Sequence, residues 1–110
     1  MNKQQFLLLK LAEECAEVAQ RASKQIQFGK DERQKDHAPH GAAAESKSNG
    51  ERLKDEILDF YAIVSFLAEE GEISLIGVSE LSEARANKKV KLQKYLDLSA
   101  SLGQLPEIKL

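Results

Sequence analysis

The sequence predicts an all-α protein, a small helical bundle of three main helices completed by oligomerisation. Apolar residues recur at helical spacing in three long stretches, residues 2–27, 48–70 and 79–101. A glycine, a common helix stop, follows each stretch, at Gly29, Gly71 and Gly103. No alternation typical of a β-strand is long enough to count. We therefore expect helices joined by connections, without a sheet.

Length and composition narrow the class of protein. A chain of 110 residues predicts one domain, residues 1–110. The composition, with 42% hydrophobic and 31% charged residues, is ordinary for a soluble helical protein. The net charge of −2 gives no reason to expect a nucleic-acid partner. Cys15 is the only cysteine, which excludes an internal disulfide and a cysteine-based zinc site. This fits a cytoplasmic protein. We expect neither a signal peptide nor a membrane span, because no apolar run is long enough.

The first helix carries a continuous apolar stripe, formed by Leu8, Leu11, Ala12, Cys15, Val18, Ala19, Ala22 and Ile26. At about 100° per residue, Glu14 flanks this stripe and Glu17 lies nearly behind it. A single buried stripe would leave Glu17 in water unless a second helix or subunit covers it. Residues 30–50 then lose all apolar periodicity, being charged and afterwards small and polar. We expect a mobile loop there, with a lid over a ligand as the alternative.

The second helix begins at a capping box, in which Ser48 and Glu51 have the required spacing. From residue 57 to 67 only Asp59 and Ser65 are polar, so we expect this helix to be buried around most of its circumference. After a short connection Ser79 is expected to cap the third helix. Its apolar stripe is Leu81, Ala84, Leu92, Tyr95, Leu96 and Leu102, with Lys88 at the centre.

Two acidic clusters fall on different helices: Glu13, Glu14 and Glu17 on the first, Glu56 and Asp59 on the second. Two antiparallel helices can bring such carboxylates together, where they repel one another unless divalent cations lie between them. Oxygen ligands favour Mg²⁺, then Mn²⁺. A di-iron site is disfavoured, because a bundle would need histidines on its helices, and His37 and His40 lie in the loop. Two alternatives stay open: a solvated acidic surface on the first helix, and a buried Asp59 paired with Arg or Lys.

The order of these motifs resembles a known family. The pattern EExxE followed by ExxD is similar to that of the all-α NTP pyrophosphohydrolases, the MazG-like superfamily, and in particular to the small MazG-like proteins often encoded by phages. The resemblance covers most of the chain and is carried by residues 13–24, 28–29, 51–53, 56–59, 88–91 and 94–96. The chain departs from the family in the gap between Glu17 and Glu56, which is longer than usual, and residues 38–47 do not align.

The resemblance implies Mg²⁺-dependent hydrolysis of a nucleoside triphosphate to the monophosphate and pyrophosphate. By position the metal ligands would be Glu14, Glu17, Glu56 and Asp59. Glu13 would be a further ligand or would orient the attacking water, and a carboxylate neighbour such as Glu17 would accept its proton.

Cations and aromatic rings complete this expectation. Lys24, Lys88 and Lys91 are expected to contact phosphate oxygens. Phe28 or Tyr61 would stack on a base, with packing as the alternative role. We also expect a homodimer or a dimer of dimers with the site near the subunit boundary.

Two other functions stay open at this point. The first is a helical interaction or regulatory module that keeps the fold without the activity. The second is a different enzyme on the same scaffold, for instance a phosphoribosyl-ATP type pyrophosphohydrolase or a dUTPase-like enzyme.

Overall fold

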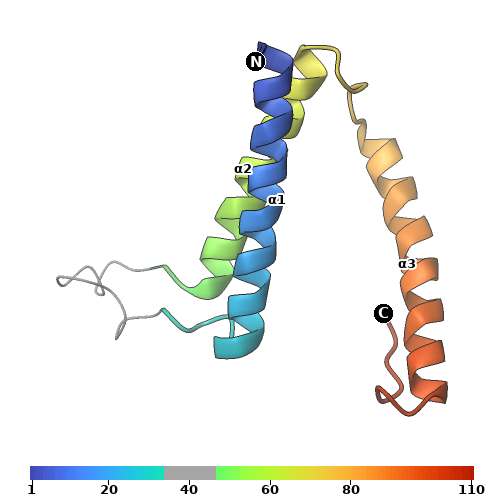
Figure 1. Cartoon of the computed structure of the whole chain (residues 1–110). Helices are drawn as coiled ribbons and strands as arrows, with labels where there is room; N and C mark the ends of the chain where they lie inside the picture. Colours follow the sequence, from blue (N-terminus) through green and yellow to red (C-terminus); the bar gives the residue numbers. More distant parts are fainter. Residues whose placement is uncertain (34–46) are drawn as a thin grey trace. The chain divides into compact units, whose positions relative to one another are not determined.

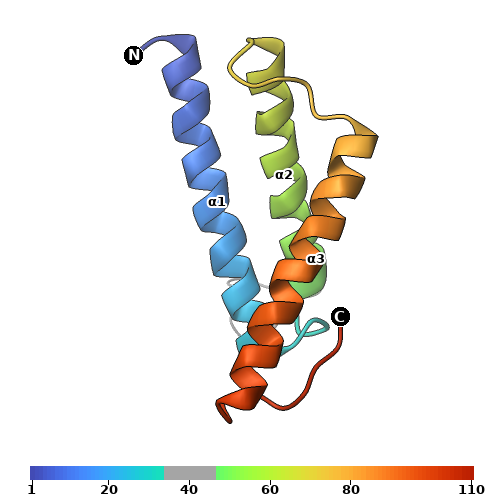
Figure 2. The same cartoon turned by 90° about the vertical axis from the view of Figure 1, so that its right-hand side faces the viewer.

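The structure, a computed structural model, describes residues 1–33 and 47–110 and contains three helices. These are α1 (Lys3–Phe28), α2 (Asn49–Glu69) and α3 (Val78–Ser101) (Figures 1 and 2). No strand occurs among the described residues, which confirms the predicted all-α class. Most of the predicted loop, with His37 and His40, lies outside the described residues. None of the helices in the described part is long and apolar enough to cross a bilayer.

The chain divides into two compact units, Met1–Leu75 and Ile76–Leu110, and each is described by itself. The first unit holds α1 and α2, and the second holds α3. The prediction of one domain over residues 1–110 stays a prediction.

Helix α1 begins and ends through local hydrogen bonds. Asn2 caps it: the Asn2 side chain accepts from the backbone N–H of Gln5 at 2.8 Å, and the Asn2 N–H donates to the Gln5 side chain at 3.0 Å. At the other end Gly29 has φ = 87° and donates its N–H to the carbonyl of Gln25 at 2.8 Å. Because this φ is unfavourable for residues with a Cβ, glycine ends the helix here, as predicted.

Helix α2 begins at the predicted capping box. The Ser48 hydroxyl accepts from the N–H of Glu51 at 3.2 Å, and the Ser48 N–H donates to the Glu51 carboxylate at 3.3 Å. The helix ends at Glu69, and Gly71 follows with φ = 75°. Both helix ends therefore agree with the sequence pattern.

The two helices run antiparallel as a hairpin, side by side in Figures 1 and 2. At one end Glu70 accepts a hydrogen bond from Gln4 at 3.4 Å and forms an ion pair with Lys3. At the other end the N–H of Asn49 donates to the Glu32 carbonyl at 2.9 Å, and the Asn49 side chain donates to the Gly29 carbonyl at 2.9 Å. These contacts set which turns of α1 face which turns of α2.

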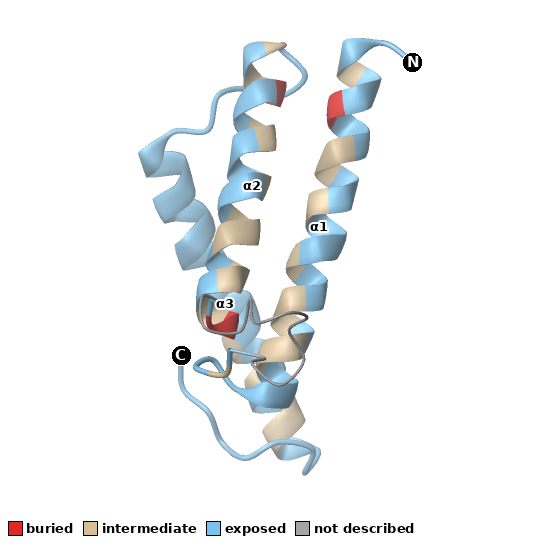
Figure 3. Ribbon diagram, turned by 90° about the vertical axis from the view of Figure 1, so that its left-hand side faces the viewer, coloured by how far each residue is buried: buried red, intermediate tan, exposed pale blue. Residues whose placement is uncertain are grey.

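The hairpin buries a narrow core. Leu7 and Leu67 are buried, and Figure 3 shows a stripe of partly buried residues along the facing sides of α1 and α2. The sequence prediction placed the α1 stripe incorrectly, since Leu7 was not included whereas Leu8 and Ile26, which were, are 46% and 86% exposed. The run of apolar residues 6–9 is compatible with several helix orientations, and packing selects the one that points Leu7 inward.

Within the hairpin, helix α2 is only partly enclosed. Leu58, Tyr61 and Phe66 are each about half exposed, so contact with α1 alone does not give the expected burial around most of the circumference, which stays a prediction for the whole chain. The physical reason is that packing against one neighbouring helix covers only one stripe. An apolar surface therefore remains on α2.

In the second unit α3 (Val78–Ser101) begins two residues earlier than the predicted Ser79 cap implies. Its N-cap is Gly77, which makes no side-chain capping bond, and Ser79 already lies inside the first turn. The predicted Ser79 cap is therefore wrong, because a capping residue must lie outside the helix. At the far end the chain returns along α3: the Gln93 side chain donates to the Ile108 carbonyl at 2.9 Å and accepts from the Leu110 N–H at 3.1 Å. No α3 residue is buried, including its predicted apolar stripe.

Candidate metal centre

Carboxylates from both helices of the hairpin converge near its middle. Glu14 on α1 and Glu56 and Asp59 on α2 each place an oxygen within 4.8 Å of the others. Glu56 and Asp59 lie three residues apart and therefore share one side of α2. The antiparallel register brings this side next to Glu14. Two of the three are partly buried, whereas Asp59 is exposed.

Glu17 joins this group from the next turn of α1. Its carboxyl lies at hydrogen-bonding range of Glu56 and of Glu14. The Glu17 side chain is nevertheless exposed. This agrees with the expectation that a single buried stripe leaves Glu17 in water unless a second helix or subunit covers it. We call Glu14, Glu17, Glu56 and Asp59 the carboxylate cluster.

The cluster shifts the proton affinity of two of its members. Close contact with Glu17 raises the pKa of Glu56, and partial burial and the charges of Glu17, Asp59 and Glu14 raise it further. Partial burial is the main cause that raises the pKa of Glu14, followed by the charges of Glu17 and Asp59. Both shifts have the same direction, because burial and neighbouring carboxyl groups each disfavour the ionised form.

Two oxygens of the cluster are buried and have no hydrogen-bond partner, Oε2 of Glu14 and Oε2 of Glu56. A buried acceptor without a partner is unfavourable, and more so when it is charged. A proton shared between the carboxyls or a bound cation would remove this cost. A hard divalent ion fits the donor set, which consists of carboxylate oxygens from two rigid helices. The cluster could therefore hold Mg²⁺ or Mn²⁺.

Glu13 lies beside the cluster but points its carboxylate elsewhere. It forms an ion pair with Lys10 at 2.9 Å, one turn earlier on α1. The charge of Glu13 still contributes, as a minor cause, to the raised pKa of Glu14. The predicted role of Glu13, to orient water or to act as a further ligand, stays a prediction.

The predicted phosphate-binding lysines are divided between the units. Lys24 is half-buried on α1, seven residues after Glu17 and thus on the same side of the helix. In the second unit Lys88 lines a cavity of about 350 Å³ with Arg85 and Lys89. Lys91 lines another, of about 450 Å³, with Lys94, Tyr95 and Leu98. Contact with phosphate stays a prediction for all three.

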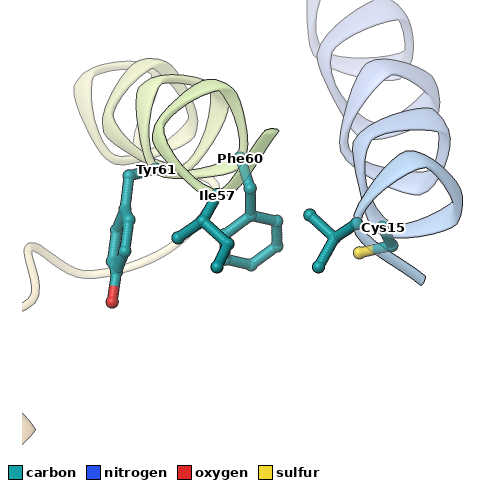
Figure 4. Close-up of a pocket in the computed structure, with 5 residues that line it drawn as sticks. Cys15, Ile57, Phe60 and Tyr61 are labelled. Carbon is teal, nitrogen blue, oxygen red and sulfur yellow. The ribbon is translucent and has the colours of Figure 1, made fainter. Parts of the chain in front are cut away.

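The candidate stacking residues lie apart from the carboxylates. Tyr61 lines an apolar pocket of about 310 Å³ with Phe60, Ile57, Val18 and Cys15, which Figure 4 shows between the two helices. The Tyr61 ring packs edge-on against Phe60, with centroids 5.9 Å apart. Cys15 and Ile57 each follow a cluster carboxylate by one residue, which is a rotation of about 100° around the helix. The pocket therefore lies on another side of the hairpin. Phe28 is 52% exposed at the end of α1.

Sequence reasoning missed two polar residues in the seam between α1 and α2. Nη1 of Arg21 and Oε1 of Gln25 are buried and have no hydrogen-bond partner. With Glu14 they follow the helical spacing i, i+7 and i+11, which is the signal that could have found them. The partly buried side of α1 thus carries polar residues at Glu14, Arg21 and Gln25, with the apolar Val18 and Ala22 between them.

Comparison with known proteins adds no assignment. No family model, curated protein or solved structure matches this chain.

Proposed function

We propose that this protein is a Mg²⁺-dependent nucleoside triphosphate pyrophosphohydrolase, which converts a (d)NTP and water to the (d)NMP and pyrophosphate. The observation that carries the proposal is the convergence of the carboxylate cluster, with buried oxygens of Glu14 and Glu56 that lack partners. The order of the acidic motifs and their resemblance to the MazG-like superfamily supply the choice of substrate.

In this proposal the cluster residues would hold the cation. Mg²⁺ or Mn²⁺ at this site would neutralise part of the negative charge of the triphosphate and lower the pKa of a water molecule bound to it. Glu17 is an exposed member of the cluster, and its carboxylate would accept a proton from the attacking water. The ion pair with Lys10 holds Glu13 at the rim, where it can orient that water. Lys24, Lys88 and Lys91 would balance charge on the phosphates.

The half-exposed apolar residues of α2, Leu58, Tyr61 and Phe66, support a second part of the proposal, self-association into a homodimer or a dimer of dimers. The same exposure would serve a non-catalytic interaction module. That alternative requires a protein that neither binds divalent ions nor hydrolyses nucleotides.

Pyrophosphate release from each NTP and dNTP tests the proposed activity. We expect release with Mg²⁺ or Mn²⁺ and none with EDTA. Glu56→Gln should reduce turnover at least about a hundredfold while it preserves helical content, because it removes a ligand charge without changing side-chain shape. Glu69→Gln, an exposed carboxylate at the end of α2, is the matched control and should turn over normally. No release from any nucleotide with either ion would refute the enzyme and leave the interaction module.

A further inference from the structure

Among the described residues, four buried side-chain atoms lack hydrogen-bond partners, and all belong to the seam between α1 and α2. They are Oε2 of Glu14, Oε2 of Glu56, Nη1 of Arg21 and Oε1 of Gln25. Two acceptors lie in the carboxylate cluster, a cationic donor follows on α1, and an amide follows one turn later. Native interiors rarely leave such groups unpaired, so this run of unsatisfied atoms requires an explanation.

The position of Arg21 relates it to the cluster. It follows Glu17 by four residues and Glu14 by seven, so all three share one side of α1. At 1.5 Å per residue these offsets amount to about 6 Å and about 10 Å along the helix axis. Arg21 therefore lies one turn beyond the carboxylates, toward the end of the hairpin where Gly29 meets Asn49.

Several other cations of the hairpin form ion pairs. Lys3 pairs with Glu70, Lys10 with Glu13, and Lys47 with Asp55. Arg21 has no ion pair among the described residues, although acidic groups lie one turn away. A buried guanidinium N–H without an acceptor is unfavourable, and its planar donors match the oxygens of a phosphate better than a lysine does.

We propose that Arg21 binds a phosphate group of a ligand whose adjoining phosphate is held at the carboxylate cluster. The inference rests on the proposed function in one respect, that this ligand is the triphosphate substrate or its pyrophosphate product. Arg21 then contributes to ligand affinity, as a neighbour of the cation site and not as part of it. The polar amide of Gln25 keeps the seam beyond Arg21 from closing as an apolar contact.

Inorganic pyrophosphate is the probe for the test, because it carries two adjoining phosphates and no base. Calorimetry would measure Mn²⁺ binding alone and pyrophosphate binding in the presence of Mg²⁺. Arg21→Gln should weaken pyrophosphate binding about tenfold or more, with Mn²⁺ affinity unchanged or tighter, since a nearby positive charge is lost. The pyrophosphate affinity of Arg21→Lys should lie between those of the wild type and Arg21→Gln, because lysine keeps the positive charge but lacks the paired N–H donors of the guanidinium group. Lys54→Gln, an exposed cation on α2, controls for net charge and should bind both as the wild type does.

Pyrophosphate affinity that is unchanged in Arg21→Gln would overturn the inference. A parallel loss of Mn²⁺ affinity would also overturn it, because Arg21 would then only organise the carboxylates. If Arg21→Gln fails to fold, Arg21→Lys takes its place. If Arg21→Lys binds pyrophosphate as tightly as the wild type does, the guanidinium group is not needed and the proposal is overturned. Hydrolysis in the wild type with unchanged KM in Arg21→Gln would refute the inference alone. Pyrophosphate binding that depends on Arg21, without release from any nucleotide, would refute only the proposed activity.

Discussion

Glu56 is surrounded by carboxyl groups from its own helix and from α1. Close contact with Glu17 raises its pKa, with partial burial and the charges of Asp59 and Glu14 as further causes. Its Oε2 has no hydrogen-bond partner. A purely structural Glu56 would be stabilised by a positively charged side chain beside its carboxylate. Among the described residues, no side chain forms an ion pair with Glu56. The surroundings of Glu56 therefore disfavour its ionised form, and either a proton or a bound cation would relieve this.

The raised pKa values of Glu56 and Glu14 predict how stability depends on pH. Because the folded protein holds protons that the unfolded chain releases near the ordinary value of 4.5, folding is favoured below the raised values and loses this contribution as pH rises through them. The metal-free protein should therefore melt at a higher temperature in mildly acidic buffer, at about pH 5, than at about pH 8. Thermal unfolding in EDTA measures this.

Two controls accompany the pH experiment. Saturating Mg²⁺ should reduce the difference, because a bound cation replaces the protons. Glu56→Gln should also reduce it, since the group no longer titrates. A melting temperature in EDTA that does not fall between these two pH values would contradict the shifts.

At the scale of the helices, the capping box of α2 fixes where the helix starts and thereby which of its turns meets α1. Ser48→Ala removes the hydroxyl that accepts from Glu51 and should destabilise the fold by about 1 kcal/mol. Urea unfolding measures the change. Ser65→Ala, an exposed serine within the same helix, should be neutral or slightly stabilising, because alanine has the higher helix propensity. Equal effects of the two substitutions would show that the cap contributes nothing.

Local signals in the sequence were sufficient to predict most helix ends. They were not sufficient to predict which side chains pack against the neighbouring helix. Ser48, Gly29 and Gly103 act at or just beyond helix ends as expected, because capping and positive φ depend on a few neighbouring residues. The Ser79 prediction was wrong, because Gly77, two residues earlier, has the extended N-cap conformation.

The orientation of α1 shows why the site was only partly predictable. Apolar residues occupy several sides of this helix, so periodicity alone cannot choose Leu7 over Leu8. The carboxylate motifs predicted which acids converge, because their spacing is local and the hairpin is antiparallel. Arg21 and Gln25 were missed because a polar residue in an interior stripe is recognised only when its neighbours on the other helix are known.

At the scale of the whole molecule, the hairpin of α1 and α2 leaves apolar residues of α2 exposed, among them Leu58, Tyr61 and Phe66. If the proposed self-association buries this surface, light scattering should give two or four times the chain mass of 12.2 kDa. Leu58→Lys, at a residue that is 54% exposed, should shift the protein toward monomers, because a buried ammonium is costly at an apolar interface. Glu69→Gln should leave the mass unchanged. A wild-type monomer at micromolar concentration would refute the association.

The contacts of Asn49 and Gly50 have a consequence for how this chain tolerates change. Asn49 donates to the carbonyl of Gly29, and the N–H of Gly50 donates to the carbonyl of Lys30 at 2.9 Å. The two ends of the connection between the helices are thus fastened to each other. Its length is therefore separated from the register of Glu14 against Glu56, and each doubling of a flexible connection costs only about 0.6 kcal/mol. Evolution or an engineer can lengthen or replace this segment while the paired carboxylates keep their alignment.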